Sequence, residues 1–164
     1  MRRMLAIGLA AGLLLSGTTA ALAVGPAQTF TQIFKNVTET FPEVNECTGD
    51  AGTVTITYNG VVHITELASG EFHITGTLTG TFVFVPNDPE RPTFTGRFTN
   101  WFGENHNLNE AAATFTFSVR GTGSDGSRIT FHAVSHITAD TIDFSTDPPT
   151  VTGLKVTFDK VACR

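Results

Sequence analysis

Apolar and polar residues alternate most clearly between Glu71 and Val85, in the stretch EFHITGTLTGTFVFV. One parity carries apolar side chains and glycine, namely Phe72, Ile74, Gly76, Leu78, Gly80, Phe82 and Phe84. The other parity is mostly threonine. A period of two over this length predicts a long strand with one buried face. The two glycines on the apolar parity indicate points where the strand bends.

Shorter segments with the same alternation predict about eight strands in all. Besides the stretch above, the expected strands are Thr29–Phe41, Thr53–Tyr58, Val61–Leu67, Thr93–Phe102, Ala111–Arg120, Ser127 to about Ser145 with a break near Asp140, and Val151–Val161. Turn signals separate them at Asn59-Gly60, at Pro86–Pro92 and at Asp147-Pro148-Pro149. The polar stretch Gly103–Glu110 is expected to be a loop.

Two loops of three residues predict how neighbouring strands align. Ala68-Ser69-Gly70 and Ser124-Asp125-Gly126 each suit a hairpin with glycine in the left-handed conformation. Both loops place apolar residues opposite apolar residues, and the first sets Ile64 opposite Ile74. Two independent loops therefore favour the same arrangement, with one apolar face and one polar face.

The Asn59-Gly60 turn is harder to reconcile with this alignment. A two-residue hairpin there sets Ile56 opposite His63, an apolar side chain against a polar one. A slip of one residue would move a whole face of the strand. The sequence leaves two interpretations open: a bulge in this hairpin, or an inward-pointing His63.

Short connections between successive antiparallel strands define the expected fold class. We predict an all-β chain, a single antiparallel meander of about eight strands that closes into a small barrel, with a β-sandwich as the alternative. Many phenylalanines fall on the inward parity, so we expect the interior to be filled with side chains.

The first residues have the pattern of an export signal. Met1-Arg2-Arg3 is positively charged, Leu5–Leu15 is apolar, and Ala21-Leu22-Ala23 fits the small-residue cleavage rule. We expect a signal peptide over residues 1–23, a single all-β domain over residues 24–164, and a secreted, extracellular protein. A retained N-terminal anchor is the alternative, but the apolar run is too short to cross a bilayer. No later apolar run reaches that length either, so no membrane association is expected after cleavage.

Two cysteines and the charge balance restrict the possible partners. In a secreted protein, the pair Cys47 and Cys163 predicts a disulfide bond. Removing Arg2 and Arg3 from the 10 basic residues leaves 8 against 15 acidic ones, a formal net charge of −7. No basic run occurs in the sequence, and nucleic acid and anionic lipid are therefore not expected as partners.

Histidine pairs provide little support for a metal site. His132 and His136 have the spacing of a zinc pair on a helix, but four residues of a strand span about 13 Å. His63 and His73 fall diagonally on adjacent strands, and a two-histidine surface site lacks the three or four ligands of a firm zinc site. We therefore predict no metal and no cofactor.

The segment that follows Trp101 is the candidate binding surface. Trp101 is the single tryptophan, its parity places it on the outer face, and hydrogen-bonding side chains follow within a few residues. An exposed aromatic ring beside amides is typical of surfaces that contact sugars or proteins. The candidate binding residues are Trp101, Glu104, Asn105, His106 and Asn107.

Several short pieces resemble those of small secreted proteins from actinobacteria. They are Cys47-Thr48-Gly49, Trp101–Asn105, Arg120–Ser127, and Phe158-Asp159-Lys160 before Cys163. The resemblance covers most of the chain after the signal peptide and implies no activity. The expected architecture is similar in shape to lipocalin-like and allene-oxide-cyclase-like barrels, although the Gly-x-Trp motif of lipocalins is absent from the first strand.

Two classes of function remain. The favoured hypothesis is a non-enzymatic secreted binding module that contacts an unknown extracellular partner or small ligand at the barrel rim and the 101–109 loop. The alternative is a lipocalin-like small-ligand carrier or a barrel cyclase or isomerase that uses inward polar groups such as Glu66, Tyr58 or His63. Glu66 is either a buried acid with a raised pKa or a solvated side chain at the rim, and the second is the commoner case.

Overall fold

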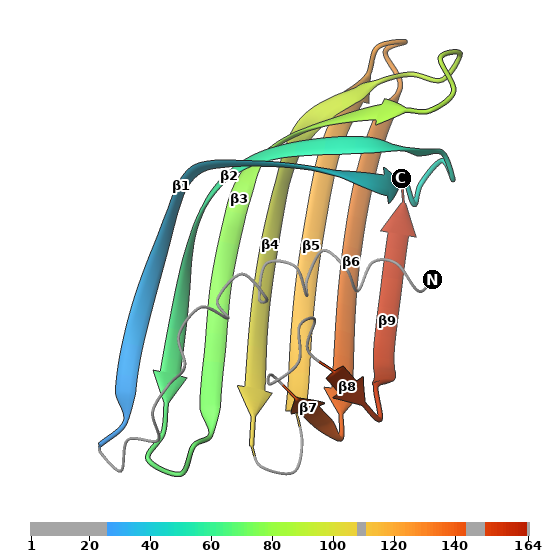
Figure 1. Ribbon diagram of the computed structural model, residues 1–164. Coiled ribbons are helices and arrows are strands. Elements are labelled where there is room, and N and C mark those ends of the chain that lie inside the picture. Colours follow the sequence, from blue (N-terminus) through green and yellow to red (C-terminus); the bar gives the residue numbers. More distant parts are fainter. Residues whose placement is uncertain (1–25, 108–110, 144–149, 164) are drawn as a thin grey trace.

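The computed structural model describes residues 26–107, 111–143 and 150–163, all of them outside helices (Figure 1). The strands are β1 (Gln28–Val44), β2 (Ala51–Glu66), β3 (Phe72–Pro86), β4 (Phe94–His106), β5 (Ala111–Gly123), β6 (Arg128–Ala139), β7 (Thr141–Asp143), β8 (Thr150–Thr152) and β9 (Lys155–Cys163). The expected signal peptide and the turn at Asp147-Pro148-Pro149 lie outside the described residues. The break expected near Asp140 is confirmed, because it separates β6 from β7.

Seven strands form one antiparallel sheet in the order β1-β2-β3-β4-β5-β6-β9. Strands β7 and β8 lie between β6 and β9 in the chain but form a separate two-stranded sheet. In the main sheet β9 therefore pairs directly with β6. Neighbours in the sheet are neighbours in the chain from β1 to β6, and the prediction of an all-β antiparallel meander is confirmed.

The sheet remains open, with β1 and β9 as its two edges. Among the described residues no hydrogen-bonded ladder joins these edges, so closure into a barrel by strand pairing is not found. Figure 1 shows β1 and β2 bending across the ends of the other strands, which brings the end of β1 beside the end of β9. A disulfide between Cys47 and Cys163 joins the two regions, with 5.5 Å between their Cα atoms.

The prediction of a hairpin at Asn59-Gly60 is wrong. Strand β2 runs through both residues, pairs along its length with β3 on one side, and pairs with β1 on the other side at every position around the turn except Asn59. The irregularity lies instead in β1, where the register shifts between Phe34 and Val37. Continuous pairing with two strands satisfies more backbone groups than a two-residue turn, and it therefore overrides the local turn preference.

The two three-residue loops have the predicted geometry. Gly70 and Gly126 both adopt a left-handed φ of 84°. The first loop places Ile64 opposite Ile74, as expected, and the second places Phe117 opposite Ala133. Because each loop sets which face its strands bury, the apolar parity faces inward from β2 to β6.

Aromatic rings on the inner face pack over glycines of neighbouring strands. Gly76 lies directly opposite Phe102, whose side chain is only 1% exposed, and Gly96 lies opposite Phe82. A Cβ atom added at Gly76 would lie 2.6 Å from Cε1 of Phe102, and one added at Gly96 would lie 2.8 Å from Cε1 of Phe82. The large neighbouring rings therefore occupy the space that glycine leaves at these positions.

The inner face is less covered along β9. Leu154, just before β9, and Val156, within it, are 47% and 49% exposed. Strand β9 is an edge strand, so it has a hydrogen-bonded neighbour on one side only. The buried core is formed mainly by β2, β3 and β4, and includes Val54, Tyr58, Val62, Ile74, Leu78, Phe82, Phe84, Phe94, Phe98 and Phe102.

Candidate functional site

The predicted binding segment after Trp101 belongs to a strand rather than to a loop. Strand β4 continues to His106, and the expected loop over Gly103–Glu110 is therefore wrong for its first four residues. Strand alternation then divides the candidate residues between two faces. Trp101 and Asn105 lie on the outer face, whereas Glu104 and His106 lie on the inner face. Asn107 follows the end of the strand and is exposed.

The inner pair contributes to the wall of the interior. His106 is 9% exposed and its ring stacks on Phe72, with 4.4 Å between ring centroids. Its Nε2 atom lies 3.6 Å from Oε2 of Glu104, so the two form an ion pair when the imidazole is protonated. Because both side chains lie on the inner face, they are separated from a partner that binds the outer face.

The outer pair lies on an accessible surface that we call the Trp101 platform. It comprises the outer-face residues Trp101, Thr77, Thr116, His73 and Asn105. Trp101 is 45% exposed, with Thr77 of β3 and Thr116 of β5 directly opposite it on its two sides. The side chains of His73 and Asn105 hydrogen-bond to each other.

Glycine leaves space for the indole ring on this platform. Gly103 occupies the outer-face position between Trp101 and Asn105. A Cβ atom built at Gly103 would lie 3.3 Å from the Cη2 atom of Trp101, so the ring lies close to the backbone of its own strand. The platform therefore presents an aromatic ring together with hydroxyl, amide and imidazole groups.

Histidines on the outer face bond to side chains of the adjacent strand. The Nδ1 atom of His63 lies 2.9 Å from Oγ1 of Thr31. The corresponding pairs on β5 and β6 are His132 with Ser118 and His136 with Thr114, each at 2.8 Å. His63 thus faces outward, and the bulge lies in β1. In the part of the chain that the structure describes, no three histidine, cysteine or acidic side chains gather in a potential metal site.

The three residues named in the enzyme hypothesis, Tyr58, Glu66 and His63, do not converge on one point. Tyr58 is 3% exposed, and its hydroxyl donates a 2.8 Å hydrogen bond to Oε1 of Glu39. Burial raises the pKa of Tyr58, and the bond to Glu39 raises it further. Glu66 lies eight residues farther along β2, about 26 Å along an extended strand. With His63 outward, the three residues of the enzyme hypothesis lie too far apart to act on one substrate atom.

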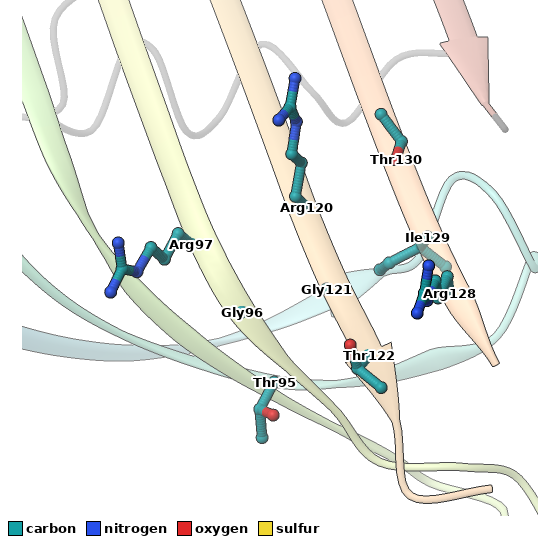
Figure 2. Close-up of a pocket in the computed structure, with 9 residues that line it drawn as sticks. All are labelled: Thr95, Gly96, Arg97, Arg120, Gly121, Thr122, Arg128, Ile129 and Thr130. Carbon is teal, nitrogen blue, oxygen red and sulfur yellow. The ribbon is translucent and has the colours of Figure 1, made fainter. Parts of the chain in front are cut away.

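A second candidate site is an open hollow of about 580 Å³. Its lining comes from β4, β5 and β6 and comprises Thr95, Gly96, Arg97, Arg120, Gly121, Thr122, Arg128, Ile129 and Thr130 (Figure 2). We call it the arginine hollow. Its three arginines are all exposed, and they account for three of the eight basic residues that follow residue 23.

Sequence reasoning missed this hollow because its arginines are widely spaced along the chain. The predicted hairpin at Ser124-Asp125-Gly126 already implies that Arg120 and Arg128 lie on the same face of adjacent strands. The position of Arg97 could not be inferred, because the loop between β4 and β5 has no turn signal that sets its length. The absence of a basic run in the sequence therefore did not exclude a basic cluster in the fold.

The described residues contain no helix of the length and apolarity that crossing a membrane requires. No family model, curated protein or solved structure matches the chain. The function is therefore inferred from the geometry of the Trp101 platform and the arginine hollow.

Proposed function

We propose that this protein is a secreted, non-enzymatic binding module that contacts a saccharide through the Trp101 platform. The observation that carries the proposal is the exposure of Trp101 on the outer face of a central strand, between two directly opposed threonines. A saccharide ring offers an apolar C–H face for the indole and hydroxyl groups for the surrounding side chains. The platform provides both kinds of contact.

The strand scaffold supports this role by holding the contact groups in place. Strand β4 is hydrogen-bonded to β3 and to β5, so the backbone beneath Trp101 has neighbours on both sides. A preorganised surface loses less conformational entropy when it binds. The bond between His73 and Asn105 orients two polar side chains at the edge of the platform.

The export pattern at the chain start and the disulfide support an extracellular location. Disulfides persist in oxidising compartments and are rare in the cytosol. Intact mass of the protein collected from the medium of expressing cells tests the proposal. We expect a chain that begins at Val24 and carries the Cys47–Cys163 bond. Retention of residues 1–23 in the secreted material would contradict the assignment.

Tryptophan fluorescence provides a direct test of binding, because Trp101 is the only tryptophan in the chain. The native protein is titrated with a panel of soluble oligosaccharides. We expect at least one to shift Trp101 emission and saturate, and Trp101→Ala to lose its binding by calorimetry.

Val85→Ala is the matched control, because Val85 is 50% exposed on the outer face of β3 but lies outside the platform. This variant should bind as the native protein does. An emission spectrum that no saccharide in the panel changes, or unchanged affinity in Trp101→Ala, would sink the proposal.

A further inference from the structure

Two arginines lie directly opposite each other on the outer face of the sheet. Arg97 on β4 pairs in register with Arg120 on β5. Like charges in this arrangement destabilise a sheet. Among the described residues, the carboxylate ion pairs involve Arg91, His106 and Lys155, not the arginines of the hollow. The protein therefore carries an electrostatic cost at this point that no described acidic side chain offsets.

The third arginine extends the cluster to a third strand. Arg128 on β6 lies opposite Thr122 on β5, and Arg120 lies opposite Thr130. Arg128 is thus diagonal to Arg120, at a backbone separation of about 7–8 Å. The outer face here forms two rows across β4, β5 and β6, namely Thr95-Thr122-Arg128 and Arg97-Arg120-Thr130. Each row combines guanidinium and hydroxyl donors.

Gly96 and Gly121 are directly opposed between these two rows, on the parity that faces the core. A side chain at either position would point toward Phe82, so only the strand backbone separates the two rows on the outer face. Figure 2 shows Arg97 and Arg120 leaning in different directions from their strands, which leaves the surface between them open. Long arginine side chains can turn toward a shared anion, and each guanidinium offers two parallel N–H donors to a phosphate or sulfate.

We propose that the arginine hollow binds a small ligand that carries two or more adjacent phosphate or sulfate groups. Arg97 and Arg120 hold one oxyanion between them, and Arg128 reaches the next. A volume of about 580 Å³ lies within the usual range of small-molecule sites. After residue 23 the chain has a formal net charge of −7, so a long polyanion such as nucleic acid that extends beyond the hollow meets a negatively charged surface, whereas a compact ligand does not extend that far.

Inorganic tripolyphosphate is a suitable probe, because it carries adjacent phosphates and no base or sugar. Calorimetry is performed on the full disulfide-bonded protein at low and at physiological ionic strength. We expect saturable binding that weakens with salt. Each of Arg97→Gln, Arg120→Gln and Arg128→Gln should lower the affinity by about tenfold, as expected for the loss of a charge-assisted hydrogen bond.

Lys160→Gln is the charge-matched control, because Lys160 is exposed on β9 outside the hollow. It should bind tripolyphosphate as the native protein does. Trp101→Ala should also retain this binding, which separates the inference from the proposed saccharide site. Without ligand, Arg120→Gln should melt no lower than the native protein, because it removes a like-charge contact. Tripolyphosphate should raise the melting temperature of the native protein but not of the arginine variants.

Three outcomes would overturn the inference. The first is no detectable binding of tripolyphosphate at low salt. The second is a loss of tripolyphosphate affinity in Lys160→Gln that equals the loss in Arg120→Gln. Equal losses would indicate a diffuse charge effect rather than a site. The third is tighter binding of inorganic sulfate or of a single-stranded oligonucleotide than of tripolyphosphate, which would indicate a single-anion site or a polymer site instead.

Discussion

Asn36 donates its backbone N–H to the side-chain Oδ1 atom of Asn59 across the β1–β2 pair, at 3.0 Å. This bond lies at the register shift between Phe34 and Val37, and Asn36 has a left-handed φ of 51°. The extra residue interrupts the ladder and leaves a backbone donor without a backbone partner. The Asn59 side chain provides the acceptor, so this asparagine stabilises the bulge instead of a hairpin turn.

Replacing Asn59 with alanine should therefore destabilise the protein. We expect Asn59→Ala to lower the free energy of unfolding by about 1 kcal/mol, because the Asn36 donor loses its protein acceptor. Urea unfolding followed by far-ultraviolet circular dichroism measures the change. Asn87→Ala, at an exposed position between β3 and β4, is the control and should change stability by less than about 0.5 kcal/mol. Equal effects of the two substitutions would contradict the role given to Asn59.

Adding a methyl group at Gly76 should disturb the core. A Cβ atom there overlaps the ring of Phe102, which is almost fully buried and has little room to move. Gly76→Ala should cost about 1–3 kcal/mol, the usual penalty for overpacking. Gly103→Ala is the control on the outer face, where the new atom would meet the edge of the exposed Trp101 ring and, at 4.0 Å, the methyl carbon of Thr75. Thermal unfolding distinguishes them, and a neutral Gly76→Ala would show that the ring can shift.

Reduction of the disulfide should lower stability more than any single surface change. Cys47 and Cys163 are 116 residues apart in sequence and join the two edge regions of an open sheet. On the chain-entropy model a loop of this length contributes about 4.7 kcal/mol. Guanidinium unfolding with and without reductant measures the loss. The double variant Cys47→Ser/Cys163→Ser should be insensitive to reductant, and an insensitive native protein would indicate that the bond contributes little.

Tyr58 should make the protein lose stability in alkali. Its pKa is raised above the ordinary value of 10.0, first by burial and then by the bond to Glu39. Above about pH 10 the unfolded chain gives up this proton while the folded chain keeps it, so stability falls as the pH rises. Below that pH the contribution is fully present.

Ultraviolet absorbance of tyrosinate reports Tyr58 alone, because it is the only tyrosine. We expect the absorbance step to coincide with alkaline unfolding and to lie above pH 10 in the native protein. Tyr58→Phe should show a weaker loss of stability above that pH. Tyrosinate that forms near the ordinary pKa in a fully folded protein would contradict the burial argument.

The sequence alone predicted the strands whose alternation is strong and whose turns are short. The segment from Phe72 to Phe84, the loops at Gly70 and Gly126, and the inward parity could be inferred because side-chain direction and turn geometry are local properties. The disulfide pair followed from the cysteine count and the export signal. The outward position of Trp101 followed from the same alternation.

Only the tertiary structure decided which local signals hold and which residues meet. Asn59 and Gly60 form no turn because β2 pairs with strands on both sides. The segment from Gly103 to His106 is strand rather than loop because β3 and β5 flank it. Strands β1 and β9 are the two unpaired edges of the sheet, and whether such edges meet depends on the curvature of the whole sheet. The meeting of Arg97 with Arg120 depends on the β4–β5 register, which is set by pairing between strands that no local turn signal aligns.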